Sequence, residues 1–283
     1  MSTETAAESR PAVAPAPPVR LPPAWRIGLA RGGLEVRQMS REKEALFFTF
    51  ALPIVLLLIF GAIFDFDIAG IPFRQYFVAG IIASGIMSTA FVSLGVGITN
   101  DRDDGTLKRL AGLPMPRSAY FIGKIIMVTA GALIETAVLL VIGSLAYGLS
   151  LPSDPGRWLT FAWVFLLGVT ACALLGIAVS SLPRSARTAS AITTLPYICL
   201  QFISGVFFPF DRLPEFLRTV AAIFPLKWLC QGLRSVFLPD RLLAVEPAHS
   251  WEHGRTALVL LAWCAGGLVL CLMTFRWKRR GEG

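Results

Sequence analysis

Residues 249–253, near the end of the chain, have the types and spacing of a zinc site. They read His-Ser-Trp-Glu-His, so two imidazoles four residues apart on a helix could bind Zn²⁺ with Glu252 as general base. A catalytic zinc also needs a third protein ligand, and among Asp, Glu and His only Glu282 follows His253. We therefore expect a polar helix start after Pro247 to contain His249 and His253, with a membrane zinc hydrolase as the less favoured alternative.

A second candidate is Glu135, a carboxylate in the middle of a long apolar segment. Placing a charge near mid-membrane costs about 2.5–3.5 kcal/mol on insertion scales, so such residues usually face protein or water and serve function. We expect Glu135 to contact substrate or to gate a path. The alternative is a packing role, with a hydrogen bond from Thr129 or Thr136. A proton relay needs several such groups, so one carboxylate gives little support to an ion-coupled secondary transporter or channel.

A charged, turn-broken stretch, residues 101–124, separates two long apolar segments. A chain that merely crossed back would need only a few polar residues there, so we expect a partner at this membrane face to contact it. Residues 106–111 are predicted to form a short helix, and Pro114 ends the run.

Acidic residues precede this short helix and basic residues lie within it, as the helix dipole favours. These residues are Asp103, Asp104, Lys108 and Arg109. Leu107, Leu110 and Ala111 share one face at i, i+3, i+4 spacing. Such a face could fill a socket on a soluble partner. A loop that caps its own spans is the alternative.

Motifs for covalent or nucleotide chemistry are missing from the sequence. It has no G-x-x-x-x-G-K-[ST] loop, because Gly123 and Lys124 lack the preceding glycine and the following hydroxyl. It also has no Gly-x-Ser-x-Gly. We expect no catalytic residue, no metal and no cofactor on this chain, and any ATP hydrolysis must come from another chain.

The composition indicates a polytopic membrane protein. Of 283 residues, 55% are hydrophobic and 16% are charged, with a mean hydropathy of +0.65, whereas soluble domains carry about 25% charged residues. The apolar residues occur in blocks near the roughly 20 residues that a bilayer span needs. The five cysteines include no Cys-x-x-Cys pair and predict neither a disulfide framework nor a metal site.

The blocks predict an all-α membrane protein with a six-span transmembrane domain over residues 45–275. The chain before it divides into a disordered cytoplasmic tail, residues 1–23, and a basic interfacial helix, residues 24–44. A second cytoplasmic tail covers residues 276–283. The expected spans are residues 45–64, 75–99, 125–147, 158–181, 191–208 and 256–275.

The basic residues predict the orientation. Given these spans, 18 Lys and Arg fall on one side and 8 on the other. Basic residues favour the cytoplasmic side of short loops, so both termini are expected in the cytoplasm, with the chain in the plasma membrane. The net charge of +8 is thus a topology signal. The expected partner is the lipid bilayer, and nucleic acid is not expected.

The last outer loop, residues 209–255, is expected to contain a re-entrant helical pair. Its first part has the spacing of one helical face, with Asp211 as N-cap and Pro225 as the stop. A second apolar piece, residues 228–238, follows, and neither piece is long enough to span. The residues of the first face are Leu213, Phe216, Leu217, Val220, Ile223 and Phe224.

Three stretches of this chain resemble the membrane subunits of type-2 ATP-binding-cassette (ABC) exporters, especially the daunorubicin-resistance-like permeases. Residues 41–53 read REKEALFFTFALP and are similar to the family's entry into its first span. Residues 104–110 read DGTLKRL and resemble its inner coupling segment, and residues 204–209 read SGVFFP and resemble its outer re-entrant region. Together they organise nearly all of residues 24–276.

The resemblance implies a permease subunit with six spans, a second permease subunit (identical or paralogous) and two ABC ATPase subunits that hold ATP and Mg²⁺. It places the ATPase contact at residues 102–113, with residues 25–43 packing nearby. ATP binding would push this segment and so open a path between the two permeases. The coupling residues are Arg102, Asp103, Asp104, Gly105, Thr106, Leu107, Lys108, Arg109 and Leu110.

The resemblance also implies an outer gate. Its residues are Phe207, Phe208, Pro209, Leu213, Phe216 and Leu217. Many relatives have Glu where this chain has Asp103 and Asp104, so either carboxylate could meet the partner. The expected function is outward transport of an amphipathic drug, antibiotic or lipid-like substrate, because generic aliphatic and small residues in the spans fit all of these. A permease-like sensor or assembly factor is a further alternative.

Overall fold

The computed structural model describes residues 22–183, 185–244 and 246–274. The two predicted tails, residues 1–23 and 276–283, lie outside the described residues apart from Pro22 and Pro23. Helices make up most of the described chain, in agreement with the predicted all-α fold class. One two-residue hairpin, β1 (Asp67–Ile68) and β2 (Ile71–Pro72), is added in the first connection.

Five helical stretches in the described residues are long and apolar enough to cross a membrane. They lie in α2 (Lys43–Ile63), in the continuous run Phe73–Asp103, in α6 (Arg117–Tyr147), in α7 (Pro155–Val179) and in α11 (His253–Thr274). The run Phe73–Asp103 comprises α3 (Phe73–Met87), a π-helical segment η1 (Ser88–Ser93) and α4 (Leu94–Asp103).

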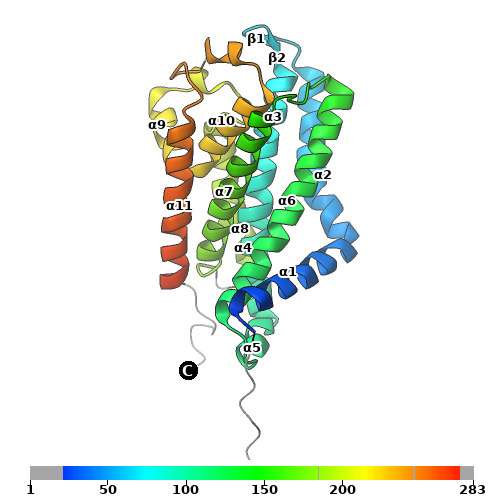
Figure 1. Ribbon diagram of the computed structural model, residues 1–283, viewed down its shortest axis with the longest axis vertical. Helices are drawn as coiled ribbons and strands as arrows, with labels where there is room; N and C mark the ends of the chain where they lie inside the picture. Colours follow the sequence, from blue (N-terminus) through cyan, green and yellow to red (C-terminus); the bar gives the residue numbers. More distant parts are fainter. Residues whose placement is uncertain (1–21, 184, 245, 275–283) are drawn as a thin grey trace, which may run out of the picture.

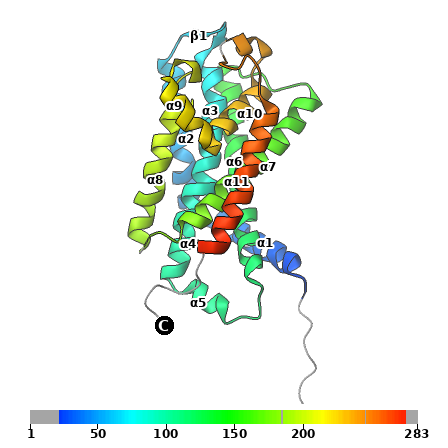
Figure 2. The same ribbon diagram turned by 90° about the vertical axis from the view of Figure 1, so that its left-hand side faces the viewer.

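The sixth predicted span, residues 191–208, is not confirmed. The helix there is α8 (Ala186–Ile203), which begins and ends five residues before the predicted bounds. It includes Arg187, Pro196 and Gln201, so it falls outside the group of five. In Figure 2, α8 runs along the bundle like the other long helices, and it packs against α4 and η1.

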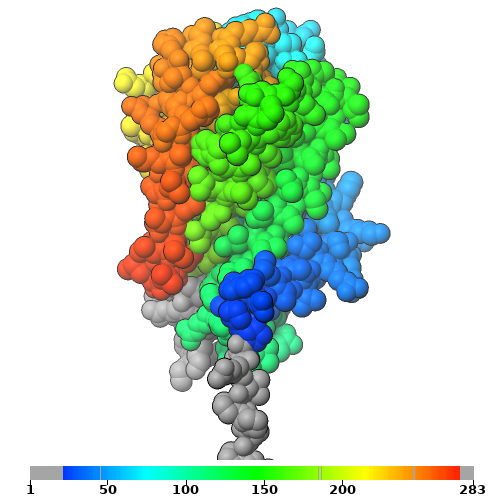
Figure 3. All heavy atoms as spheres, in the orientation of Figure 1, coloured from blue at the N-terminus to red at the C-terminus, as the bar shows by residue number. Residues whose placement is uncertain are grey.

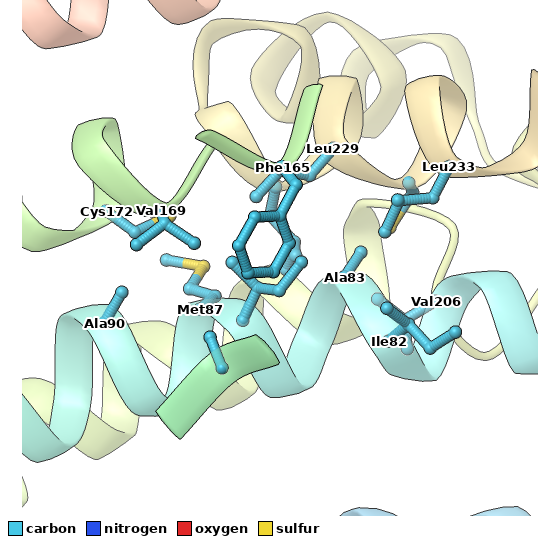
Figure 4. Packing of buried hydrophobic residues seen from close by; sticks show 14 of the residues in the cluster. Ile82, Ala83, Met87, Ala90, Phe165, Val169, Cys172, Val206, Leu229 and Leu233 are labelled. Carbon is cyan, nitrogen blue, oxygen red and sulfur yellow. The ribbon is translucent and has the colours of Figure 1, made fainter. Parts of the chain in front are cut away.

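The helix α3 lies at the centre of the bundle, with α2, α6, α7 and α10 (Pro225–Phe237) around it. Figure 4 shows Ala83 and Met87 of α3 facing side chains from α7 and α10, with Ile82 beside Val206. Gly80 lies where a Cβ would meet the Val206 carbonyl oxygen at 2.8 Å. Small residues in α3 therefore let neighbouring segments approach closely. Those facing side chains are Phe165, Val169 and Cys172 of α7 and Leu229 and Leu233 of α10.

The helix α1 (Ala24–Arg41) lies across the lower part of α6 (Figure 3). It is shorter than the predicted 24–44, because the chain breaks at Glu42 (ψ 60°) before α2 begins. A Cβ at Gly28 or Gly32 would lie 2.7 Å from Ile122 or Ile126. Two glycines four residues apart thus bring α1 into close contact with α6.

The molecule has two distinct ends (Figures 1 and 2). The helices α1 and α5 (Thr106–Ala111) lie at one end, which we call the α5 end. The opposite end carries the hairpin, so we call it the β1 end. It also contains η2 (Phe210–Arg212), α9 (Glu215–Ile223), α10 and η3 (Asp240–Ala244).

Candidate functional sites at the two ends of the bundle

The segment between α4 and α5 makes a sharp reversal at the α5 end. Gly105 adopts φ +72°, a left-handed conformation that glycine takes without steric cost. The helix α5 then begins at Thr106 and ends at Ala111, over the predicted residues. Asp103 closes α4 and Asp104 is its C-cap, so both acids lie directly before the turn.

The predicted apolar face of α5 is only partly available to a partner. Leu107 is 1% exposed and packs into the core of this chain, so its expected place in a partner's socket is wrong. Leu110 is half-buried against the same core, whereas Lys108, Arg109 and Ala111 are exposed. The outward surface of α5 is therefore basic with small apolar residues, and it continues into exposed Leu113.

Arg102 and Arg109 both donate to backbone carbonyl groups near the turn. Arg102 Nη2 donates to the carbonyl oxygen of Pro183 at 2.9 Å, which joins the end of α4 to the connection between α7 and α8. Arg109 Nη2 donates to the carbonyl oxygen of Asp104 at 3.4 Å and to Thr106 Oγ1 at 3.3 Å. These bonds join α5 to the end of α4, and the end of α4 to the α7–α8 connection.

Sequence reasoning missed a buried ionic cluster behind α5. Lys124 Nζ lies 2.9 Å from Glu35 Oε2 and 2.9 Å from Asp101 Oδ2. Arg31 Nη2 pairs with Glu35 Oε1 at 2.9 Å, and the Tyr120 hydroxyl donates to Asp101 Oδ2 at 2.7 Å. Lys124 is 7% exposed and Glu35 is 9% exposed. We call these five residues the α5-end cluster; they join α1, α4 and α6.

One signal in the sequence could have pointed to this cluster. Glu35 is the one acidic residue among the 18 of α1 and follows Arg31 by four positions, the spacing of an intrahelical ion pair. Its second bond, to Lys124, crosses 89 residues of sequence. No local pattern reports such a distant partner.

Glu135 is buried in α6 beside η1. Thr89 Oγ1 donates to Glu135 Oε2 at 2.7 Å, and Oε1 has no hydrogen-bond partner among the described residues. Of the predicted donors, Thr129 instead donates to the carbonyl oxygen of Ile125 at 2.7 Å. The partner, Thr89, belongs to the π-helical turns of η1, and such turns frequently mark functional sites.

A second polar group near mid-bundle joins α8 to α3. The Ser84 and Tyr197 hydroxyl oxygens lie 2.9 Å apart, and Gln201 Nε2 donates to the Tyr197 hydroxyl at 2.8 Å. All three side chains are buried. The helix α8 is therefore fixed to the central helix by hydrogen bonds as well as by apolar contacts.

At the β1 end, η2 is followed by two short helices whose boundaries differ from those of the predicted pair. Asp211 lies in η2 and the N-cap of α9 is Pro214, so the predicted N-cap is wrong. Pro225 stops α9 and starts α10, a helix position where its missing N–H costs nothing. All 13 residues of α10 are buried, and the helix contacts α3, α7 and α11.

The six predicted gate residues do not share one surface. Phe207 is buried, with its ring 5.4 Å from that of Phe60. Phe216 is 75% exposed, and Phe208 is exposed as well. Pro209, Leu213 and Leu217 are half-buried. The outward members form an apolar face on α9 and the loop before it, whereas Phe207 belongs to the core.

The helix α10 carries a second buried ionic cluster. Arg234 is 1% exposed; it donates to the Gly205 carbonyl oxygen, lies 3.9 Å from the Tyr76 ring centre and is 3.8 Å from Glu246 Oε1. Lys227 Nζ lies 3.7 Å from Glu252 Oε2. We call Tyr76, Lys227, Arg234, Glu246 and Glu252 the β1-end cluster.

The pKa values of the two carboxyl groups of this cluster, Glu246 and Glu252, are shifted in opposite directions. Burial raises the pKa of Glu246, and the charges of Arg234 and Lys227 offset this only in part. Burial also raises the pKa of Glu252, but hydrogen bonds from Gln231 and Arg255 and the charge of Lys227 outweigh it and lower the pKa below 4.5. Glu252 is therefore the carboxylate held ionised by its neighbours.

The two histidines of the His-Ser-Trp-Glu-His segment have separate partners. His249 precedes α11, adopts φ +48° and has Nδ1 3.1 Å from the Leu243 carbonyl oxygen. His253 begins α11, with Nε2 2.9 Å from Ser235 Oγ. Within the described residues no group of three or more His, Cys, Asp and Glu could hold a metal ion. The pair thus lacks the shared helix that the zinc alternative requires.

The five long apolar helices define a multi-pass membrane protein. The polar turn at α5 lies at one end of these helices, and the short buried helix α10 lies toward the other. The chain belongs to the ABC-2 type transporter family, which matches residues 33–238. It is therefore a membrane permease, a non-catalytic transport subunit, and permeases of this family act with ABC ATPase subunits. The resemblance inferred from the sequence is confirmed at the level of this family.

Several relatives are known at low identity. YvfS of Bacillus subtilis, named a transport permease, is 19% identical over 68% of this chain and 77% of that protein. The protein ycf38 of Porphyra purpurea, also named a transport permease, is 26% identical over 71% of this chain and 70% of that protein. The linearmycin resistance permease protein LnrN of Bacillus subtilis is 24% identical over 56% of this chain and 40% of that protein.

Proposed function

We propose that this chain is the permease subunit of a drug or antibiotic exporter of the daunorubicin-resistance-like branch. Its family membership supports a transport subunit, and the name of the relative LnrN supports resistance to an antibiotic as the purpose of transport. The substrate is an amphipathic drug, antibiotic or lipid-like molecule that moves outward across the plasma membrane.

The proposed assembly contains two permease subunits and two ABC ATPase subunits, with ATP and Mg²⁺ bound to the ATPases. The helix α8 provides the sixth crossing, because it runs along the bundle and is fixed to α3 by buried hydrogen bonds. With six crossings both termini lie in the cytoplasm. The α5 end then faces the ATPases, in agreement with the excess of basic residues on that side.

The α5 segment, residues 102–113, is the proposed ATPase contact. One observation carries this assignment: α5 is a short helix with a buried anchor, Leu107, and an outward basic surface at Lys108 and Arg109. Pressure on that surface reaches α4 through the Gly105 turn and reaches the α7–α8 connection through Arg102. Coupling follows when the ATPase makes different contacts with α5 in its two states.

Glu135 and the α9 region are assigned to the path itself. Oε1 of Glu135 has no hydrogen-bond partner within the part of the chain that the structure describes, and it lies beside the π-helical turns, which supports a gating or substrate-contact role at mid-membrane. The exposed apolar face around Phe208 and Phe216 supports an outer gate formed with the second permease subunit.

The coupling proposal is tested with the double variant Ala111→Asp/Leu113→Asp in the chain co-expressed with its ATPase. Both residues are exposed, so the bundle is expected to remain folded and inserted. ATP-dependent export in vesicles and the amount of ATPase that co-purifies should both fall at least tenfold, since two added carboxylates oppose the charge of a surface that is basic at Lys108 and Arg109. The matched control is Leu151→Asp, an equally exposed leucine at the β1 end. Full export and full ATPase association in the double variant would remove α5 from the contact.

A further inference from the structure

A cavity of about 370 Å³ opens between α1, α2, the central helix and α6, next to the α5-end cluster. Its volume is in the range of small-molecule sites. No residue lining it has been assigned to the substrate path so far. The lining residues fall into two groups: charged and amide side chains at one end, and apolar side chains together with Thr49, Thr89 and Ser93 along the rest.

The polar group marks the mouth at the α5 end. It contains Glu35, Gln38, Glu42, Asn100, Asp101 and Lys124. Three of these are carboxylates and one is an ammonium group, and Arg31 also pairs with Glu35, so one negative charge is left over at the mouth. Lys124 is bound by Glu35 and Asp101, whereas Glu42 accepts a hydrogen bond from Gln38 at 3.0 Å and forms no ion pair among the described residues. Glu42 is the carboxylate left to meet a cation.

The deeper part of the cavity follows one face of η1 and α4, the second half of the continuous run Phe73–Asp103. Thr89, Ser93 and Gly97 line it at four-residue spacing, so they lie on one helical face. A Cβ at Gly97 would meet nothing within 4 Å, which leaves this wall open. The opposite walls are apolar, with Leu46, Phe50, Met127 and Val128. The cavity therefore combines an acidic mouth with a largely apolar interior that reaches Thr89, the hydrogen-bond donor to Glu135.

We propose that this cavity is a binding site for a lipophilic organic cation that enters from the membrane leaflet at the α5 end. The charged group lies at Glu42, and the apolar part lies against α2 and α6. The site lies within one subunit, so it binds without a second permease. This inference rests on the proposed export function and narrows its substrate class to cations.

The charge claim is tested by equilibrium binding to the purified permease alone in nanodiscs of zwitterionic lipid, with empty nanodiscs subtracted. The probes are tetraphenylphosphonium and its isosteric anion, tetraphenylborate. The cation should bind specifically and the anion should not. Glu42→Gln should weaken cation binding about fivefold, as expected for loss of one exposed charge pair. The matched control Glu44→Gln removes the same charge two residues away, outside the lining, and should have no effect.

The location claim is tested by filling the cavity with Gly97→Leu. This side chain enters the open wall and should weaken tetraphenylphosphonium binding at least tenfold, because the ligand and the leucine compete for one volume. The control Gly266→Leu adds the same side chain on α11, where a Cβ also meets nothing within 4 Å. Equal binding of both probes, or unchanged binding in both Glu42→Gln and Gly97→Leu, would overturn the proposal.

The same preparations separate this proposal from the export function. Co-purification of the ATPase is measured for each variant and should remain at the wild-type level, because none of the substituted residues belongs to the proposed contact at residues 102–113. Lost cation selectivity with intact ATPase association would sink the cavity site and leave the permease function standing. Failure of the ATPase to co-purify with the wild-type chain would contradict the proposed export function instead.

Discussion

The α5-end and β1-end clusters are both buried ionic networks, yet they are constructed differently. At the α5 end the ion pairs are 2.9 Å long, and they join three helices that also border an open cavity. At the β1 end, Arg234 and Lys227 lie on one fully buried helix and are 3.7–3.8 Å from their carboxylates.

The difference indicates two roles. In the α5-end cluster, charges join α1 to α6 beside the cavity, in addition to the close packing at Gly28 and Gly32. In the β1-end cluster, α10 is already enclosed by α3, α7 and α11, and the ion pairs are added to a helix that packing holds in place. We infer that the α5 end is arranged to transmit movement and the β1 end to resist it.

The largest expected effect comes from Arg234→Met, which removes the centre of the β1-end cluster. Glu246 would remain buried without its cation, and such loss typically costs about 3–5 kcal/mol. We expect a strongly lowered melting temperature in detergent and poor recovery from the membrane. The control Arg241→Met, at an exposed arginine of η3, should melt like wild type. Equal melting of the two variants would break the contrast between the clusters.

A smaller effect is expected for Lys124→Met in the α5-end cluster. Glu35 keeps its pair with Arg31, and Asp101 keeps the Tyr120 hydroxyl, so the loss should be about 1–3 kcal/mol. Export should fall more than stability does, because α1 loses its bond to α6. A double-mutant cycle with Glu35→Gln measures the coupling. A coupling energy near zero would show that glycine packing alone positions α1.

The smallest effect concerns pH and Glu252. Its pKa in the folded protein is lowered below 4.5, so its contribution to stability is present above pH 4.5 and is lost as the pH falls through that lower value. The melting temperature of the wild type should therefore be higher than that of Glu252→Gln at pH 7, and the difference between the two should disappear in acid. A gap that widens in acid would mean that the carboxylate is destabilised by its surroundings.

The sequence predicted the features that local patterns report. Apolar blocks gave the positions of the long helices, Pro114 and the charges around it gave α5, and Pro225 gave the break between α9 and α10. The polar segment 101–124 was recognised because its composition differs sharply from that of the apolar segments on either side.

The features that the sequence did not predict depend on contacts between distant residues. Leu107 is buried by neighbours that its own helix does not specify, and Glu135 bonds to Thr89, 46 residues away. The bounds of α8 shifted because hydrophobicity alone extended the span through Phe208, whereas the helix ends near Gly205, a residue with φ +80°. The cavity has no local signal, because four separate segments enclose it.

The π-helical segment Ser88–Ser93 sets the rotational phase of the central helix. Each residue of an α-helix turns the chain by about 100°, and a π turn accommodates an extra residue without breaking the helix. Deleting one residue here would return these turns to regular α-helix and leave Gly97 and Asn100 facing nearly the same way relative to Phe73–Met87. The wide turn therefore absorbs one residue of sequence. The helix face that lines the cavity keeps its alignment with the half of the helix that is buried in the bundle.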